Sequence, residues 1–502
     1  FGDFGVDITL GGNQRYARND YNSVTVQDFI QPGLYTVMNG RIKDPLYRLS
    51  EKKINSLFGA ATFSYKEFLY LGVTARNDWF STLAPANRSI LYPSVTGSFV
   101  FSQAFEGLPS WISFGKLRAA YAQVGSDNVN PYSNALYYEV ENNSFPNPSG
   151  QLVPVGGINT GTVPNKNLRP LRIQEAEAGI ELKMFENKIG LDFTYYHKTT
   201  DDQILAAQIS DASSYTRKLI NVGRSMNQGV EMLLTFAPVV TKDFRWDVSA
   251  NASYNTSKVL KLGLSDNDTI ITVSSGGGRT LNQVVGKPLS QIYTFTYRRD
   301  EQGRKVFDPK SGFPLRNNVQ QNFGSALPKY FGGITNTFTY RGISLSTLID
   351  FKLGHKMIAG RNINYVRHGL SKRTLPGRDV GYVIGEGVNP NGEINQTRAL
   401  VQPFYESLNP QGINEDFVFN AGFWKLRQIT LGYDFTRLLG ERSFVKGLKL
   451  NAVANNVLII KKWTENMDPE EALNSSDNAV GLDFWPGLPP TRSMGFNLNV
   501  RF

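Results

Sequence analysis

The chain has 502 residues and a net charge of +10; 12% of its residues are aromatic, 47 are glycine and none is cysteine. The lack of cysteine excludes disulfides, thiolate nucleophiles and zinc–thiolate centres, and no apolar run is long enough for a transmembrane helix. The basic residues are scattered without a cluster, which argues against nucleic acid as a partner.

Many segments alternate apolar and polar residues with a period of two, the pattern of a β-strand with one apolar face. In chain order, the clearest are 94–101, 189–196, 244–254 and 493–502. The first places Phe101 on an apolar face, and the third places Val248 toward lipid and Ser249 toward a lumen. About 14 strands of roughly 9 to 13 residues are predicted, the length needed to cross a bilayer. Strands of soluble proteins average only about 5 to 6 residues.

The predicted links between strands alternate between short and long. The short links are 66–68, 185–187, 238–243 and 341–342, and the long links are 125–173, 199–227, 255–328, 353–421 and 458–490. Outer-membrane barrels have short periplasmic turns and long extracellular loops. We therefore predict an all-β fold, a transmembrane antiparallel β-barrel in the outer membrane of a Gram-negative bacterium.

Aromatic residues near the predicted strand ends would form girdles at the two membrane interfaces. The candidates are Trp79, Phe80, Tyr92, Trp111, Phe114, Phe244, Trp246, Tyr254, Tyr330 and Trp424. An ordinary β-sandwich core would also use such residues, but the length of the strands favours girdles.

Residues suited to catalysis or metal binding are few. His197, His355 and His368 lie far apart without a metal-binding spacing, and we predict ordinary surface or wall positions for them. The glycine-rich segment 274–280 lacks the flanking elements of a phosphate loop and is predicted as loop. The acidic pairs 201–202 and 470–471 fall in loops or rims that lack apolar surroundings to tune a pKa. We predict neither enzymatic activity nor a cofactor.

The polar face of the predicted strands carries charges of both signs. Such side chains can form hydrogen bonds to a plug domain or to a polar solute. The lumen-facing candidates are Arg76, Asp78, Arg118, Glu177, Glu181, Lys183, Asp192, Glu231, Arg245 and Asp247.

The order of several short motifs resembles the SusC/RagA family of TonB-dependent transporters over nearly the whole chain. The motifs are LYPS (91–94), KLRAAY (116–121), EAEAGIE (175–181), NQGVE (227–231), GKPL (286–289), PKYFGGITN (328–336), WKLR (424–427) and MDPE (467–470). Glycine at bends and Asn or Asp at turns also explain such motifs. We therefore assign them mainly to barrel construction.

The resemblance implies that residues 1–502 are the C-terminal part of a 22-stranded plugged barrel, with the periplasmic domain, plug and first strands absent from this sequence. It implies import of oligosaccharides or oligopeptides, with a SusD-like surface lipoprotein as lid and TonB acting through the missing part. Contact with outer-membrane lipid and lipopolysaccharide, and pairing of two transporter–lipoprotein units into a dimer, would follow. Phe502 resembles the terminal signal read by the barrel-assembly machinery.

Two alternatives stay open. The chain could be a self-contained 14-stranded passive channel or fatty-acid-type transporter, which needs neither plug nor TonB. It could also be a soluble all-β glycan-binding protein, which would extract into buffer without detergent.

Overall fold

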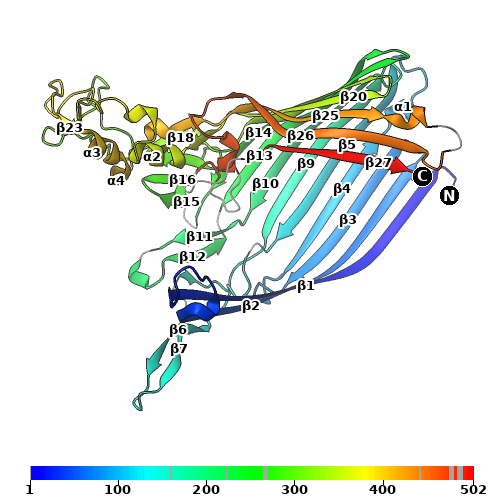
Figure 1. Ribbon diagram of the computed structural model, residues 1–502. Coiled ribbons are helices and arrows are strands. Elements are labelled where there is room, and N and C mark those ends of the chain that lie inside the picture. Colours follow the sequence, from blue (N-terminus) through cyan, green and yellow to red (C-terminus); the bar gives the residue numbers. More distant parts are fainter. Residues whose placement is uncertain are drawn as a thin grey trace. The chain divides into compact units, whose positions relative to one another are not determined.

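One antiparallel sheet of 14 strands forms the framework, in agreement with the predicted fold class and strand number. The computed structural model describes residues 2–127, 129–158, 161–209, 211–221, 223–263, 269–439, 443–473, 480–482 and 490–502. The strand order is β1-β2-β3-β4-β5-β9-β10-β13-β14-β19-β20-β25-β26-β27, so neighbours in the sheet follow one another along the chain (Figure 1). The strands are β1 Phe4–Phe29, β2 Gly40–Tyr65, β3 Leu69–Phe80, β4 Ser89–Phe99, β5 Ile112–Ser126, β9 Leu171–Met184, β10 Ile189–Asp201, β13 Arg224–Val240, β14 Phe244–Lys261, β19 Tyr330–Tyr340, β20 Ile343–Leu353, β25 Phe423–Asp434, β26 Gly447–Lys462 and β27 Ser493–Arg501.

The chain divides into two compact units. The first comprises 1–99, 118–176 and 198–225, and it holds β1 to β4. The second comprises 100–117, 177–197 and 226–502, and it holds the strands from β14 to β27.

Pairing in the second unit gathers apolar side chains on one face of the sheet. Ala250 of β14 lies opposite Ile334 of β19, which lies opposite Ile349 of β20. Their sequence neighbours Ser249 and Thr335 pair with each other on the other face. The predicted alternation of this part of the chain is therefore confirmed, and the sheet has one apolar and one polar side here.

The first two strands are much longer than the sequence predicts. β1 and β2 have 26 residues each, but β3 pairs only with Ile54–Tyr65 of β2. The residues from Gly40 to Lys53 pair with β1 alone, so a two-stranded ribbon continues past the end of β3 (Figure 1). The prediction assumed that each strand is only as long as a bilayer crossing requires. It therefore underestimates the length of β1 and β2, because their ribbon extends beyond the wall.

The long links of the first unit hold smaller β-elements. These are the hairpin of β6 Tyr138–Pro146 with β7 Leu152–Ile158, and a small sheet of β8 Thr162–Val163, β11 Ile204–Gln208 and β12 Arg217–Asn221. Strand β6 also lies against β2.

The long links of the second unit, predicted as loops, fold into a lobe that we call the long-loop lobe (269–326 and 355–421). It contains the sheet of β15 Ile270–Gly276, β16 Arg279–Val284, β17 Gln291–Thr294 and β18 Gln321–Ser325, the pairs β21 Lys356–Ile358 with β24 Val418–Asn420 and β22 Tyr382–Val383 with β23 Ala399–Leu400, and the helices α2 Gly360–Arg367, α3 Val401–Glu406 and α4 Leu408–Gln411. Leu281, Ile292, Ile358, Ile413 and Phe417 belong to its buried core. The lobe lies at the end of the strands away from the C-terminus (Figure 1). None of the helices in the described ranges is long and apolar enough to cross a membrane.

The prediction of loop for the glycine-rich segment 274–280 is wrong. It forms the β15–β16 hairpin, in which Gly276 pairs with Arg279. Gly277 and Gly278 make the turn with φ of +56° and +76°, a backbone conformation that two-residue hairpin turns require and that glycine adopts without strain.

Three of the aromatic predictions also need correction. Phe101 is not in a strand but begins the short helix α1 (Phe101–Ala104), and its ring occupies the space beside Gly115, where a Cβ atom would lie 2.0 Å from it. Phe80 and Tyr92 do not lie at an interface either. They are 3% and 7% exposed, in a buried cluster with Leu83, Ile90 and Leu168.

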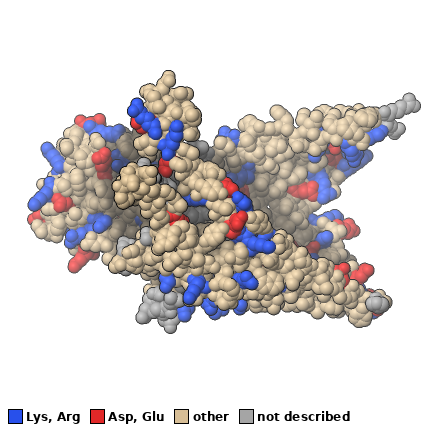
Figure 2. Space-filling view, turned by 90° about the horizontal axis from the view of Figure 1, so that it is seen from below, with Lys and Arg blue, Asp and Glu red and all other residues tan. Residues whose placement is uncertain are grey.

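Charged side chains of both signs are dispersed over one face of the molecule. On the face that Figure 2 shows, Lys and Arg lie interspersed with Asp and Glu. This distribution agrees with the scattered basic residues of the sequence and contrasts with the basic stripe of a nucleic-acid-binding surface.

His355 lies between β20 and β21 and is neither a surface nor a wall residue, contrary to the prediction. Its side chain is 2% exposed, and neither ring nitrogen has a hydrogen-bond partner. Burial, and to a lesser degree the charge of Lys352, lowers the pKa of His355 from 6.5 to about 4.

We therefore expect the lobe segment around His355 to open in mild acid. Because the folded pKa lies below the unfolded value, the stabilisation is present above pH 6.5 and is lost as the pH falls toward 4, up to about 3 kcal/mol. Amide hydrogen exchange of β21 and β24, corrected for intrinsic rates, should rise roughly a hundredfold across this window. The variant His355→Leu should not show this rise; an equal rise in both proteins would contradict the prediction.

Candidate functional site

Four of the ten predicted lumen-facing residues form ion pairs with each other, one pair in each unit. In the first unit, Arg76 Nε donates to Asp78 Oδ1 at 2.8 Å, and the same guanidinium donates to Ser56 Oγ at 2.8 Å. In the second unit, Arg245 binds Asp247 through both Nε and Nη2 at 2.7 Å. The partners stand two residues apart on one strand, so both side chains of each pair point to the same face.

The remaining candidates differ in their surroundings. Lys116 Nζ lies 2.6 Å from Glu181 Oε2, and Lys183 Nζ lies 5.4 Å from the ring centroid of Phe114. Arg118 and Asp192 are half-buried, whereas Glu177 and Glu231 are exposed. The assignment of these ten residues to a lumen stays a prediction.

A larger charged cluster, which the sequence reasoning missed, lies on the polar face of β25. Residues 348 and 349 of β20 pair with Gln428 and Leu426, so the intervening Arg427 is an extra, unpaired residue. A β-bulge of this kind redirects a side chain and bends the strand. Lys425 lies opposite Asp350 in the strand register, and the bulge brings the guanidinium of Arg427 to the Asp350 carboxylate.

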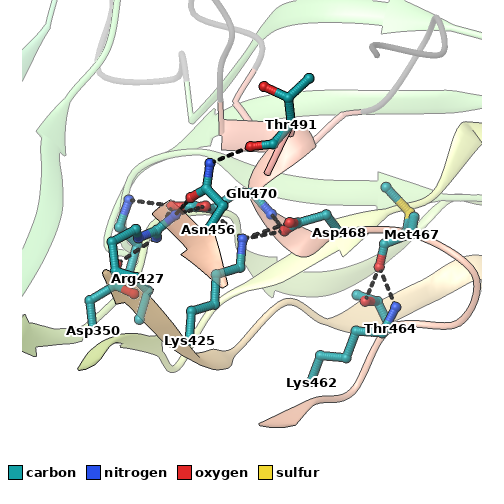
Figure 3. A network of polar contacts seen from close by, with 11 residues as sticks. Asp350, Lys425, Arg427, Asn456, Lys462, Thr464, Met467, Asp468, Glu470 and Thr491 are labelled. Carbon is teal, nitrogen blue, oxygen red and sulfur yellow. Dashed lines mark hydrogen bonds and ion pairs between the residues drawn. The ribbon is translucent and has the colours of Figure 1, made fainter. Parts of the chain in front are cut away.

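We call this cluster the clamp, and it comprises Asp350, Lys425, Arg427, Asp468 and Glu470 (Figure 3). Lys425 Nζ lies 2.6 Å from both Asp468 Oδ1 and Glu470 Oε2. Arg427 Nη2 lies 2.6 Å from Asp350 Oδ2 and 2.8 Å from Glu470 Oε1. The clamp thus ties the link after β26 to the wall strands β20 and β25.

The clamp is largely removed from water and its charges balance. The Lys425 side chain is 5% exposed and that of Asp468 is 11% exposed. With Lys352, whose Nζ lies 4.0 Å from Glu470, three cations face three carboxylates. Although burial opposes the effect, hydrogen bonds from Arg427 and Lys425 lower the pKa of Glu470 from 4.5 to about 2.

Further bonds extend the clamp into the link and the long-loop lobe. Met467 O accepts hydrogen bonds from Lys462 Nζ and Thr464 Oγ1 at 2.7 and 2.9 Å. In the next residues, the helical turn η6 (Pro469–Leu473) carries Glu471, which lies 2.6 Å from Arg361 of α2. Glu470 and Glu471 do lie in a link, as predicted, and both are paired with cations away from water. The prediction that their surroundings do not tune a pKa is wrong for Glu470.

A cavity of about 810 Å³ lies in the long-loop lobe. Its lining includes Tyr297, Lys305, Phe307, Arg373, Phe404 and Asp416. Tyr297 donates its hydroxyl proton to Asp416 at 2.7 Å, and Lys305 Nζ lies 3.6 Å from the centroid of the Tyr297 ring. Burial and the Asp416 carboxylate raise the pKa of Tyr297, so the hydroxyl stays protonated. The cavity offers apolar surface together with cationic groups.

Neither the clamp nor the cavity of the long-loop lobe has the arrangement of a metal centre. In the part of the chain that the structure describes, no group of three or more His, Cys, Asp or Glu residues could hold a metal ion. The clamp carboxylates bind cationic side chains instead.

Comparison with known proteins identifies relatives over the length of the chain. Residues 1–457 match a family described as TonB dependent receptor-like, beta-barrel. TonB-dependent receptor P3 of Formosa agariphila is 22% identical over 493 residues, covering 91% of this chain and 46% of that protein. TonB-dependent receptor SusC of Bacteroides thetaiotaomicron is 24% identical over 483 residues, covering 92% of this chain and 46% of that protein. The chain thus spans about half the length of these relatives.

A solved structure shows the same fold. The RagAB peptide transporter aligns with a TM-score of 0.77 and 19% sequence identity, covering 100% of this chain and 53% of that chain.

Proposed function

The chain belongs to the TonB-dependent receptor β-barrel family of the outer membrane, and from this membership we propose that the whole protein imports large polar nutrients. The cargo would be an oligosaccharide or an oligopeptide, captured together with a SusD-like surface lipoprotein. TonB would supply the energy through parts of the protein outside this sequence. The family consists of receptors and transporters, so the proposal includes no catalytic step.

The two-sided character of the wall carries this proposal. One face of β14, β19 and β20 is apolar, and the other bears hydroxyls and the paired charges of Arg245 and Asp247. A closed wall of this kind can meet lipid outside and a plug or a polar solute inside. Paired charges of both signs suit hydrogen bonding to an uncharged oligomer, because neither sign dominates.

The long-loop lobe supports contact with the cargo or the lipoprotein. Its cavity is large enough for a single residue of an oligomer, and it combines aromatic rings with Lys305 and Arg373. Loops that stand on a rigid sheet are the usual place for recognition.

Uptake by cells tests the proposal. A strain that lacks the gene, complemented with the full-length protein, would be given labelled oligosaccharides and oligopeptides that are too large for porins. We expect uptake of one class only, abolished by deletion of TonB or by a protonophore. Uptake that continues without TonB would instead support a passive channel.

Deletion of Phe502 tests the proposed assembly signal. Phe502 is 71% exposed and its ring lies 5.2 Å from that of Phe444, so its loss removes few contacts within the chain. If the assembly machinery reads this residue, we expect a severalfold loss of folded protein in the outer membrane, measured by heat-modifiable mobility on gels. Replacement of Phe502 by Tyr should restore assembly, and normal assembly after the deletion would refute the signal.

A further inference from the structure

The cavity of the long-loop lobe has a wall that is held in place by its own backbone. The N–H of Phe307 donates to Val388 O at 2.8 Å, and the N–H of Val388 donates to Lys305 O at 2.9 Å. Two glycines permit this close approach. A Cβ atom on Gly385 would lie 2.1 Å from the Phe307 ring, and one on Gly387 would lie 2.1 Å from the carbonyl oxygen of Lys305. The cavity is therefore preformed, and these backbone groups are already paired and do not offer an edge to a peptide strand.

The lining of the cavity carries more positive than negative charge. Among the described residues that line it, the charged ones are Arg299, Arg304, Lys305, Arg373, Glu386 and Asp416. The three arginines form ion pairs with carboxylates outside this lining, namely Glu415, Asp300 and Glu465 at 2.5, 2.7 and 3.0 Å. The four cationic side chains are between 32% and 44% exposed. The cavity therefore presents an excess of hydrogen-bond donors, while most of the balancing carboxylates lie outside its lining.

Two of these cations are positioned by aromatic rings of the same lining. Lys305 Nζ lies 3.6 Å from the centroid of the Tyr297 ring, and the guanidinium carbon of Arg373 lies 5.8 Å from the centroid of Phe417. Both cations also lie near Asp416. Lys305 Nζ is 3.9 Å from the carboxylate, too far for a hydrogen bond, and Arg373 donates to the main-chain oxygen at 3.4 Å. A ring face attracts a cation without using its N–H donors, so Lys305 keeps donors for an incoming anion.

Aromatic side chains supply apolar surface beside the cations. The rings of Phe307 and Phe404 are stacked with their centroids 6.4 Å apart and an interplanar angle of 12°, and Tyr405 meets Phe404 edge-on at 5.2 Å. All three residues line the cavity. A ligand that matches this lining has an apolar ring face together with an anionic group. A pyranose presents such a face through its axial C–H groups, and a carboxylate or sulfate on the sugar supplies the anion.

We propose that this cavity binds an anionic sugar unit, a pyranose that carries a carboxylate or a sulfate, and thereby selects acidic oligosaccharides as the cargo. This inference rests on the proposed function. The cavity volume of about 810 Å³ lies within the range of about 300 to 1,000 Å³ that is typical of small-ligand sites. An oligosaccharide repeats one unit, so fixed donors meet the same group in every molecule, whereas the side chains of oligopeptides vary. The paired charges of the wall favour neither sign, so selection by charge comes from the cavity.

Binding of the full-length transporter, purified in mild detergent, to an oligosaccharide array tests this selection. The array carries oligosaccharides with uronate or sulfate groups, each beside its methyl-esterified or desulfated counterpart, and acidic peptides. We expect at least one anionic oligosaccharide to bind about tenfold more tightly than its neutral counterpart, because a hydrogen bond to a charged group is lost in the latter. This preference should shrink as the salt concentration rises.

Substitutions of Lys305 assign the binding to the cavity. Lys305→Met removes the cation and keeps an unbranched side chain, so the affinity for the anionic oligosaccharide should fall about tenfold. Lys305→Arg keeps the charge and should retain most of the affinity. The control is Lys310→Met, because Lys310 is exposed and lies outside the lining; it should bind like the wild type. Heat-modifiable mobility checks that each variant is folded.

The possible outcomes separate this inference from the proposed function. If no anionic oligosaccharide binds better than its neutral counterpart, the selection by charge is overturned and the proposed import stays intact. Equal affinities of Lys305→Met and Lys310→Met would place the binding outside the cavity and overturn the inference as well. Tighter, Lys305-dependent binding of acidic peptides would assign the cavity to a peptide and overturn the assignment to a sugar. If binding depends on Lys305 but cells take up no oligomer, the proposed import fails and the site stands.

Discussion

Replacement of Lys425 by Met should release the link after β26 from the wall. The side chain of Lys425 is 5% exposed, and its Nζ lies 2.6 Å from both Asp468 and Glu470. Its removal leaves Asp468 without its cationic partner in a poorly hydrated site and Glu470 with Arg427 as its main partner, and breaking a buried ion pair in this way costs about 3 to 5 kcal/mol. We expect amide hydrogen exchange of residues 464–473 to rise by at least a hundredfold, while the barrel stays folded.

Two controls make this expectation specific. Lys461 lies on β26 and is exposed, so Lys461→Met should leave the exchange of 464–473 unchanged. Adding Asp468→Asn to Lys425→Met removes the carboxylate charge that the first change leaves without a cation, and it should recover part of the loss, because the two residues act as a pair. Exchange in Lys425→Met as slow as in Lys461→Met would show that the clamp does not hold the link.

The pH dependence of the clamp should differ from that of the His355 segment. The pKa of Glu470 is lowered from 4.5 to about 2, so its contribution is present above pH 4.5 and is lost only as the pH falls toward 2. Exchange of 464–473, corrected for intrinsic rates, should therefore be the same at pH 7 and pH 5. The segment around His355 should already open within this pH range, because the pKa of His355 is lowered from 6.5 to about 4.

The strands of the wall could be predicted from the sequence, because lipid on one side and the lumen on the other impose a strict alternation on each strand. Residues 493–502 show this most clearly: Phe496 pairs with Ala452 and Leu498 with Leu450 on the apolar side, as the alternation predicts. Motif glycines have physical reasons as well. A Cβ atom on Gly332 would lie 2.2 Å from the carbonyl oxygen of Asn251, so the neighbouring strand approaches too closely for a side chain.

The clamp and the long-loop lobe could not be predicted from the sequence in the same way. Lys425 and Asp468 are 43 residues apart, and only the fold brings them together. The sequence did contain a signal for the clamp: WKLR has two cations and MDPE has two carboxylates, in each case two residues apart. Alternation within a strand does not show, however, that this strand contacts that link. The lobe core draws single apolar residues such as Leu281, Ile292 and Ile413 from separate segments, and no periodic pattern marks them.

Tyr330, a predicted girdle residue, and Tyr340 lie at the two ends of the apolar side of β19, while the girdles themselves stay a prediction. Tyr330 and Tyr340 stand at the two ends of this strand and are 49% and 47% exposed. They are an even number of residues apart, so they share the face of Ile334. Ten residues of strand at about 3.4 Å, tilted by about 40°, match the apolar band of about 25 Å in outer-membrane barrels. If the two tyrosines mark the membrane interfaces, Ile334 lies near the middle of the membrane.

An arginine at Ile334 should consequently impair folding far more than an arginine at Thr335. The guanidinium would enter lipid near the midplane, at a cost of about 2 to 4 kcal/mol. Thr335 faces the other side, opposite Ser249, where a charge stays hydrated. Val248 is a poorer probe than the pattern predicts, because it is 7% exposed and pairs with the polar Asn336. Urea titration of the folded fraction in vesicles measures the difference, with Ile334→Met as the uncharged control. Equal losses for the two arginine variants would mean that the two faces of this wall do not meet different solvents.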